Sequence, residues 1–579
     1  MLSEVSYDTF YNHEALTALL DQWAVQRPDL ITVESIGRSW QGRDIWLATC
    51  TDAATGAAGD KPGFFVEANV HAAELTSSTA ALHLLHRLLS GADGADERVR
   101  RLLRTRTVYV VPRLCPDGAE DVVTTGGYVR SSVRPHPDPE PAPGLHQGDV
   151  DGDGRALFMR APDPTGPWKP CPADPRLLVR RDPDEEGGEY YRLFLEGRVL
   201  DHDGATVPAA PAYRGLDLAS NFHSDWPDLA RRPRESGPFA GSEPEIHALL
   251  RAITDRPNLT GYLSLHTFGA VHLRPPLNDD DPLPIDDLMR YEALGERAVE
   301  LTGYPVVAYD DLKHAPYRVR GGQLAWLYRE RGIYAWVTEL WNPLRAAGVD
   351  ASHPAKWLVE HGVEDDLALL RWSDDELGGK GFVDWYAFDH PELGKVELGG
   401  WDVVHTWYNP PAWRRRDEVA PVAEWAIHLA LASPLLQLLE LDARHVSGDV
   451  HVVRAVVANT GWLPTNVTEQ ARLRDQAPPV TATIELPAGA SLVTGRQRVE
   501  LGQLAGRSGA RSSTTWWGHE PGTPDRALVE WVVQAPDLGC VEVAVSQPRA
   551  GVATLGVELD IELDNEPDSE LGSAGGGPR

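Results

Sequence analysis

Three apolar segments of this chain each end on an ionisable side chain. The segment GFFVEANV leads directly into His71, with Glu74 three residues later, GYLSLH ends at His266, and IYAWVTE ends at Glu339. Burying an imidazole or a carboxylate costs free energy unless the group is paired. Ligands of open α/β sheets bind at the carboxyl ends of the strands. The three endings therefore predict one sheet and one site on which these side chains converge.

The rest of the first 375 residues alternates between strand and helix patterns. Strands are expected near residues 30–36, 44–50, 63–70, 107–112, 261–265 and 333–338, and helices near 16–23, 78–89, 243–253 and 285–301. Such alternation is typical of a sheet covered by helices on both faces. We therefore predict a three-layer α/β domain with a mixed sheet over residues 1–375. A Pro- and Asp-rich insertion without clear periodicity interrupts it at 130–214.

The pattern becomes purely β toward the C-terminus. Segments such as HVVRAVVANTG, VTATIELP and CVEVAVSQP read as strands separated by turn residues, which predicts an antiparallel β-sandwich over residues 442–565. Residues 376–441 are then a connecting region, and residues 566–579 a disordered tail. We expect the sandwich to pack on or near the face that carries the site.

Charge and composition exclude several classes of partner. The chain has 54 basic and 86 acidic residues and a formal net charge of −32, so phosphate backbones and anionic lipids would repel it. No apolar run reaches the length of a membrane span. The first residues show no basic segment followed by an apolar one, so we expect no signal peptide and a cytoplasmic protein. The sequence does not predict the oligomeric state.

Two histidines and one carboxylate are a common ligand set for catalytic zinc, with a fourth position left for water. The strand endings supply His71, Glu74 and His266, which predicts one zinc ion per chain. Glu339 is then free to act as a general base on the water. The alternative is that the histidines are hydrogen-bonded core residues and that Glu339 pairs with an arginine.

Taken together, the motifs resemble the zinc carboxypeptidases related to carboxypeptidase A, over about residues 6–370. His71 and Glu74 are similar to the family's H-x-x-E, and His266 to its distal histidine. Gly215-Leu216-Asp217 is similar to G-V-D, which implies that Asp217 orients the first zinc histidine. The segment YRVRGGQLAWLY resembles Y-x-x-x-G-G-x-x-x-W-x-Y, which implies that Tyr317 caps the substrate.

The resemblance also implies roles for further residues. Glu339 takes the place of the catalytic glutamate, and zinc-dependent hydrolysis of peptide bonds is the implied reaction. Arg160 in LFMRAP resembles the arginine that stabilises the oxyanion, although the insertion makes this match weaker.

One departure concerns the recognition of a C-terminal carboxylate. The family pattern G-V-D-x-N-R-N reads here G-L-D-L-A-S-N, so Ala219 and Ser220 replace the Asn and Arg that grip the carboxylate. A serine cannot imitate an arginine fork. Ser220 and Asn221 stay as candidate substrate-binding residues, and Arg318 and Arg320 are candidates for a replacement cation.

Three interpretations of the function remain open at this point. The first is a metallocarboxypeptidase-like peptidase. The second is an N-acyl amino-acid deacylase of the aspartoacylase type, and the third is a zinc-bearing binding module that has lost hydrolysis. Within the insertion, Asp149, Asp151 and Asp153 follow the start of a calcium loop, but position twelve is Arg160 instead of glutamate, which favours a plain acidic turn.

Overall fold

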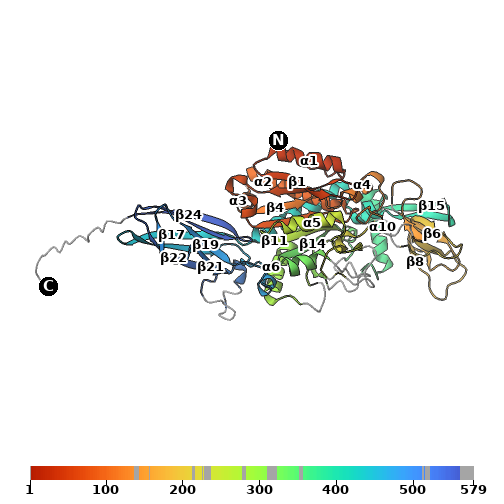
Figure 1. Ribbon diagram of the computed structural model, residues 1–579. Coiled ribbons are helices and arrows are strands. Elements are labelled where there is room, and N and C mark those ends of the chain that lie inside the picture. Colours follow the sequence, from red (N-terminus) through yellow and green to blue (C-terminus); the bar gives the residue numbers. More distant parts are fainter. Residues whose placement is uncertain are drawn as a thin grey trace, which may run out of the picture.

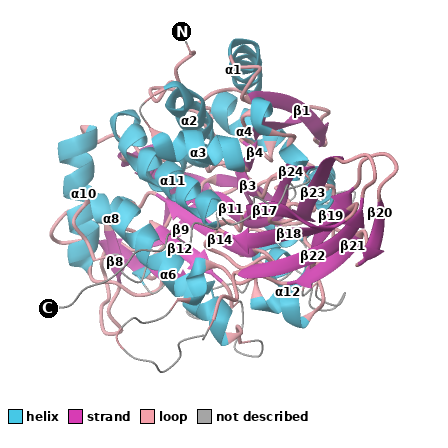
Figure 2. Ribbon diagram, turned by 90° about the vertical axis from the view of Figure 1, so that its left-hand side faces the viewer, coloured by secondary structure: helices cyan, strands magenta, loops and turns pink. Residues whose placement is uncertain are grey.

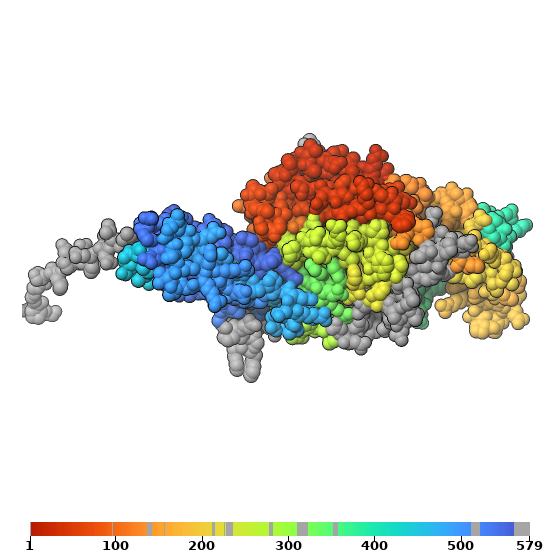
Figure 3. Space-filling view, viewed as in Figure 1, coloured from red at the N-terminus to blue at the C-terminus, as the bar shows by residue number. Residues whose placement is uncertain are grey.

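The computed structural model describes residues 2–94, 96–135, 142–155, 157–210, 215–224, 226, 236–276, 282–309, 322–350, 357–510, 514 and 522–560. The molecule is elongated (Figure 1). An α/β body stands in the middle, a β-sandwich lies at one end, and a smaller sheet lies at the other. The space-filling view shows the same order of parts (Figure 3). The predicted three-layer α/β fold with a C-terminal sandwich is confirmed.

The centre of the body is a mixed sheet, for which eight strands are described, in the order β1-β2-β4-β3-β11-β14-β12-β13. Strands β3, β4, β11 and β14 run parallel to their neighbours within this group. In sheet order the strands are β1 (Ile31–Arg38), β2 (Asp44–Cys50), β4 (Thr107–Val111), β3 (Gly63–Ala68), β11 (Leu259–Thr267), β14 (Tyr334–Leu340), β12 (Val271–Arg274) and β13 (Val306–Ala308). Strands β3 and β11 are buried along their whole length, as the central strands of a covered sheet must be.

Helices cover both faces of this sheet. One face packs against α1 (His13–Gln26), α2 (Leu75–Asp93), α3 (Glu97–Thr105), α6 (Ile285–Thr302) and α11 (Ala412–Ala432). The other packs against α4 (Pro116–Thr125), α5 (Pro244–Thr254), α7 (Gln323–Ala325) and the π-helical turn η6 (Trp326–Glu330). Figure 2 shows α2, α3 and α11 as neighbours, in agreement with their contacts. Two further helices, α8 (Pro343–Ala346) and α10 (Val363–Leu377), follow β14.

The prediction of a connecting region at 376–441 is wrong. Its last helix, α11, places Trp425 and Ile427 in the same buried core as α2. Its first part forms the hairpin β15 (Phe382–His390) and β16 (Gly394–Trp401), which pairs with β6 (Phe158–Pro162) of the insertion. The sequence pattern could not predict this pairing because the partner strands lie more than 200 residues apart.

The insertion itself is built from short strands whose sequences show no regular alternation of apolar and polar residues. Strands β9 (Tyr191–Leu195), β7 (Trp168–Pro170) and β8 (Leu178–Arg180) extend the β15-β16-β6 sheet, to six strands in the described chain. Strands β5 (Gly144–Gln147) and β10 (Gly197–Leu200) form a separate pair. Elements of three to five residues are too short for a pattern of alternation to identify them.

The sandwich consists of two antiparallel sheets, each with four described strands. The first has the order β17-β18-β22-β20, and the second β21-β19-β23-β24. These strands are β17 (Leu436–Ser447), β18 (Val450–Asn459), β19 (Val480–Glu485), β20 (Ser491–Thr494), β21 (Arg498–Gly502), β22 (Arg526–Gln534), β23 (Gly539–Gln547) and β24 (Gly551–Leu559), with a short helix α12 (Glu469–Leu473) between them. The first strand begins earlier than predicted, and the predicted tail lies outside the described residues.

The sandwich docks at the amino-terminal ends of the central strands. Arg549 donates to the carbonyl oxygen of Gly332, just before β14, at 3.1 Å. Ser433, which follows α11, hydrogen-bonds Thr260 at the start of β11 at 2.7 Å. The expectation that the sandwich packs on or near the site is therefore wrong, because the predicted ligands lie at the opposite ends of the strands.

Candidate metal centre

The turn after β3 carries the first two candidate ligands. Asn69 adopts a left-handed backbone conformation (φ 60°), which asparagine tolerates better than most residues. Its side-chain amide donates to the carbonyl oxygens of His71 and Glu74, at 2.7 and 3.1 Å. The turn thus brings both side chains to the carboxyl end of β3, where α2 begins.

The three predicted ligands come together. The Nδ1 atom of His71 lies 2.6 Å from Oε1 of Glu74, and Nδ1 of His266 lies 3.1 Å from Oε2 of the same carboxylate. The two Nδ1 atoms are 3.2 Å apart, and all three side chains are buried. One donor atom from each lies within 4.8 Å of the others. The set fits a zinc ion, because two imidazole nitrogens and one carboxylate oxygen converge on the same point.

The outward-facing nitrogens of both histidines are held by other side chains. Nε2 of His71 lies 3.2 Å from Oδ1 of Asp217. Nε2 of His266 lies 2.9 Å from Oγ of Ser264, which in turn donates to the buried carboxylate of Glu67 at 2.7 Å. Partners of this kind fix the orientation and tautomer of a metal-binding imidazole. They leave Nδ1 of each ring as the atom presented to the site.

The charges in the site shift the pKa values of its groups. Burial opposes ionisation of Glu74, but the adjacent His71 and His266 outweigh it and lower the pKa of Glu74 to about 2. Burial likewise disfavours protonated His266, yet the carboxylates of Glu74 and Glu339 raise its pKa to about 9. Arg130 and His71 hold the pKa of Asp217 well below its usual range, against the effect of burial.

Glu339 lies directly beside the ligands. It pairs in register with His266 across the parallel strands β11 and β14. Burial, with the charge of Glu74 in addition, raises the pKa of Glu339 to about 7, while His266, His71 and Arg130 oppose the shift. A carboxyl with a pKa near neutral is well placed to exchange protons at physiological pH.

A cation that the sequence analysis did not select also faces the site. The backbone N–H of Ala72 donates to the carbonyl oxygen of Arg130 at 2.8 Å, so the two chain segments run side by side. The guanidinium of Arg130 lies 3.3 Å from Asp217 and 3.8 Å from Glu74. Gly118 makes this approach possible, since a Cβ there would lie 2.2 Å from the carbonyl oxygen of Ser131.

Comparison with known families agrees with this geometry. The zinc carboxypeptidase family matches residues 16–156 and 177–347, together more than half of the chain. The chain belongs to this family. A domain family of unknown function matches residues 435–558, the sandwich. Among the described residues, no helix has the length and apolar character needed to span a membrane.

Known relatives are similar to parts of this chain. Carboxypeptidase B of Astacus astacus is 27% identical over 346 residues, covering 58% of this chain and 88% of that protein. A zinc carboxypeptidase of Saccharothrix mutabilis subsp. capreolus is 25% identical over 122 residues, 21% of this chain and 28% of that protein. Human carboxypeptidase D is 33% identical over 138 residues, 20% of this chain and 10% of that protein.

Solved structures show a more distant similarity. The thrombin-activatable fibrinolysis inhibitor has a TM-score of 0.41 at 14% identity, over 74% of this chain and 75% of that chain. The carboxypeptidase A of Helicoverpa armigera has a TM-score of 0.38 at 19% identity, over 59% of this chain and 66% of that chain.

Arg160 does not lie among the candidate ligands. It lies on β6 in the small sheet, where Nε donates to Glu397 of β16 at 2.7 Å. The rings of Tyr191 and Trp385 lie on its guanidinium, each with a centroid distance of 4.6 Å. The prediction that Arg160 stabilises an oxyanion is therefore wrong. Arg130 is the arginine beside the ligands, and the sequence marks it only as the first residue of the predicted insertion (130–214).

The remaining predicted substrate residues divide into two groups. The amide of Asn221 is buried and donates to Ser236, Phe239 and Ser242, while Oδ1 accepts from the backbone N–H of Glu243. Asn221 therefore holds a loop instead of facing substrate, which corrects that prediction. Ser220 is half-buried and donates to Asp217 at 3.3 Å. Tyr317, Arg318 and Arg320 lie outside the described residues.

The three aspartates of the insertion accept backbone N–H groups of their own loop, and Asp151 in addition accepts the hydroxyl of Tyr386 of β15 at 2.5 Å. Asp149 accepts backbone N–H groups of Gly152 and Gly154, and Asp153 accepts that of Arg155. This is the bonding of an acidic turn, and nothing in the comparisons supports bound calcium.

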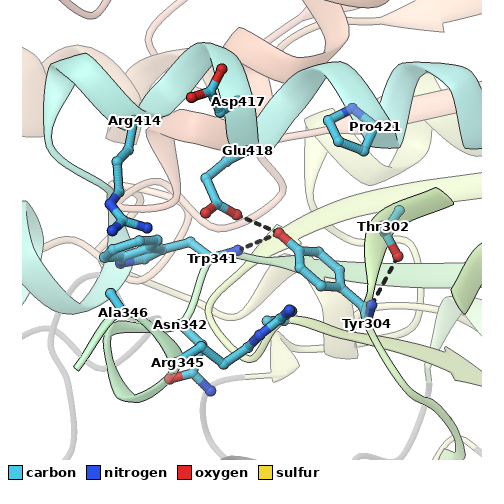
Figure 4. A pocket seen from close by; sticks show the side chains of 11 residues that line it. Thr302, Tyr304, Trp341, Asn342, Arg345, Ala346, Arg414, Asp417, Glu418 and Pro421 are labelled. Atoms are coloured by element: carbon cyan, nitrogen blue, oxygen red, sulfur yellow. Dashed lines mark hydrogen bonds between the residues drawn. The ribbon is translucent and has the colours of Figure 1, made fainter. Parts of the chain in front are cut away.

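A cavity of about 200 Å³ adjoins the end of β14, and none of the predicted zinc ligands lines it (Figure 4). Its wall includes Trp341 and Asn342, which directly follow β14, and the side chains of Tyr304 and Glu418. The hydroxyl of Tyr304 donates to Glu418 at 2.5 Å and accepts from the backbone N–H of Trp341 at 3.3 Å. These bonds help to fix the chain just after Glu339.

Proposed function

We propose that this protein hydrolyses peptide bonds at a zinc ion held by His71, Glu74 and His266. The observation that carries the proposal is the side-by-side position of His266 and Glu339 on neighbouring parallel strands, which sets a base next to the ligand trio. Family membership supports zinc as the metal and a peptide as the substrate.

Each residue of the site would have a separate role in the hydrolysis. Bound zinc would lower the pKa of a water molecule and polarise the scissile carbonyl. Glu339 would take a proton from the attacking water and return it to the leaving nitrogen. Arg130 would donate N–H groups to the carbonyl oxygen as negative charge develops there. Asp217 would hold His71 in orientation, and Tyr317 would cap the substrate.

The missing Asn-Arg pair affects which peptides bind. Ala219 offers only a methyl group, and the hydroxyl of Ser220 already donates to Asp217. A carboxylate near the metal without a cationic partner is costly to desolvate. We therefore expect a free C-terminal carboxylate to contribute little to binding.

The test compares a peptide that has a free C-terminus with its amidated twin. Wild type should cleave both with similar kcat/KM, and the double variant Ala219→Asn, Ser220→Arg should prefer the free acid. A strong wild-type preference for the free acid that is lost in Arg318→Ala or Arg320→Ala would show that one of these arginines took over the role.

Metal analysis provides a second test. His71→Ala should lose zinc while keeping the fold, and full zinc occupancy in this variant would contradict the ligand assignment. Hydrolysis of N-acyl amino acids but of neither peptide would favour the deacylase interpretation. Zinc binding without turnover of any of these substrates would favour a binding module.

A further inference from the structure

A short segment beyond the part matched by the family contacts the residues next to the candidate ligands. After β16 the chain forms the π-helical turn η7 (Val403–Tyr408) and reaches Asn409. The buried side chain of Asp402 starts this turn by accepting the backbone N–H of His405 at 2.9 Å. We call residues 402–409 the crossing segment. The family match ends at residue 347, so its pattern does not include this segment.

The crossing segment is bonded to both sides of the ligand Glu74. Asn409 is fully buried, and its Oδ1 accepts from the backbone N–H and the hydroxyl of Thr76, both at 2.9 Å. Its Nδ2 donates to the carbonyl oxygen of Ala73 at 2.8 Å. One side chain thus fixes the residue before Glu74 and the second residue after it.

The same segment contacts the ends of the other two strands. Two residues after Glu339, the indole N–H of Trp341 donates to the carbonyl oxygen of Thr406 at 2.9 Å. Two residues after His266, the ring of Phe268 lies edge-on to Trp407 and Tyr408, with centroid distances of 5.4 and 5.5 Å. The three strand ends that carry the ligands and the base are therefore joined by one eight-residue segment.

Tyr408 extends this contact toward Arg130. Its hydroxyl lies 3.4 Å from that of Tyr128, and the two rings are 5.5 Å apart. Burial raises the pKa of the Tyr408 phenol, the charge of Glu74 adds to the effect, and Arg130 opposes it. Tyr408, Tyr128 and Phe268 are all half-buried residues.

We propose that the crossing segment is a working part of the active site. Asn409 acts as a positioning residue for the zinc ligand Glu74. Tyr408, with Phe268 and Tyr128, forms an aromatic wall against which a large apolar or aromatic side chain of the substrate binds. The part of this inference that concerns the substrate side chain (the substrate half) rests on the proposed peptide hydrolysis. The part that concerns Asn409 and zinc binding (the zinc half) does not.

The zinc half is tested by chelator competition on the purified full chain. Asn409→Ala should bind zinc about 10–100-fold more weakly than wild type, the range found when partners of metal ligands are removed. Asn459→Ala is the matched control, because Asn459 is also buried and donates to two backbone carbonyls, but within the sandwich. Unchanged zinc affinity in folded Asn409→Ala would overturn the proposal.

A second variant covers the case in which Asn409→Ala does not fold. Trp341→Phe removes the hydrogen bond to Thr406 and keeps most of the ring. It should weaken zinc binding in the same direction by a smaller factor, and wild-type affinity in Trp341→Phe would then count against a role of the segment in the metal centre.

The substrate half is tested by binding to the zinc-loaded Glu339→Gln protein, which should hold peptides without cleaving them. The probes are amidated pentapeptides of alanine with Phe, Leu, Ser or Asp at the central position. We expect the Phe and Leu peptides to bind about 10–200-fold more tightly than the Ser peptide, the range for apolar contacts in a pocket. Adding Tyr408→Ala should remove this preference, and adding Tyr408→Phe should keep it.

A preference that survives Tyr408→Ala would overturn the aromatic wall. Tyr386→Ala, on β15 of the small sheet, is the control and should not change the preference. If no peptide binds the Glu339→Gln protein, the proposed peptide hydrolysis and the substrate half fail together. The zinc measurement on Asn409→Ala still decides the other half in that case.

Discussion

The central sheet carries an addition at each end of its strands, and the two additions are bonded to it in different ways. At the amino-terminal ends, the sandwich bonds to backbone carbonyls of the body, as where Arg549 donates to Arg331 and Gly332, and α12 donates two backbone N–H groups to the carboxylate of Asp287. At the carboxyl ends, the chain that leaves the small sheet reaches the turns next to Glu74, His266 and Glu339. Figures 1 and 3 show the sandwich and the small sheet at opposite ends of the molecule.

We therefore expect contacts at the strand starts to affect stability and contacts at the strand ends to affect the reaction. Hydrogen bonds to backbone carbonyls at the strand starts fix how two domains sit together, and they touch no ionisable group of the site. Contacts at the strand ends set the positions of the proposed zinc ligands and the proposed base, where displacement by about 1 Å can cost about 10²-fold in rate. Substitutions at the two ends should therefore produce different measurable effects.

The largest effect is expected at the carboxyl ends, from Glu339→Gln. The amide keeps the size of the side chain but cannot accept a proton from water, so kcat should fall by about 10²–10⁴-fold. Zinc content should stay at the wild-type level, since Glu339 is not among the ligands. Activity close to wild type on any substrate would show that another group is the base.

The next effect distinguishes the two arginines. Arg130→Gln should lower kcat by about 10²–10³-fold, the range for loss of one donor to an oxyanion. Arg160→Gln should leave kcat/KM near the wild-type value, because its contacts lie within the small sheet. Steady-state kinetics on one peptide compares both. The reverse ranking would mean that the small sheet, and not the segment beside His71, supplies the catalytic cation.

Zinc affinity should depend on pH through His266. Its pKa is raised to about 9 in the metal-free protein, so the ring is protonated at neutral pH and must lose a proton to bind zinc. Affinity should therefore rise about tenfold per pH unit from pH 6 and level off near pH 9. Competition titrations in buffered chelator give this slope. A flat profile between pH 6 and 9 would contradict the coupling of His266 to the carboxylates.

The smallest effect on activity is expected at the amino-terminal ends. Arg549→Ala leaves two backbone carbonyls without their donor and should cost about 1–3 kcal/mol of unfolding free energy. Thermal unfolding should show the loss, while kcat/KM and zinc content stay the same. A tenfold fall in kcat/KM with zinc retained would show that the two ends of the sheet are coupled.

The sequence predicted the parts of the site that depend on local pattern. His71, His266 and Glu339 were visible because each follows or ends an apolar strand, and Glu74 was visible because it stands three residues after His71. Arg130 was not, since no pattern separates it from a solvated arginine, and Arg160 received the assignment because LFMRAP resembles the family's arginine segment. The position of the ring of Tyr191 against Arg160 depends on pairing across the insertion, which no local pattern reports.

In the fold, too, features with a local sequence pattern were predictable and long-range contacts were not. The central strands and flanking helices follow from alternation and burial, but the role of residues 376–441 depends on contacts at long range. Asn409 reaches Thr76 across more than 330 residues of chain, and Trp425 of α11 packs edge-on against Trp336 of β14. Such contacts have no signature near either residue, so a single sequence cannot reveal them.

The late position of α11 in the chain has a consequence for biosynthesis. Between the release of Leu340 and that of Ala432 from the ribosome, translation takes ~5–20 s at about 5–20 residues per second. During that interval the apolar side of α2 that α11 will cover is exposed, and the metal-ligand turn lacks Asn409. The nascent chain is then open to chaperones and to aggregation. A fragment that stops at residue 375 would remain in that state permanently, so a shortened chain meant to retain the catalytic unit should extend through Ala432.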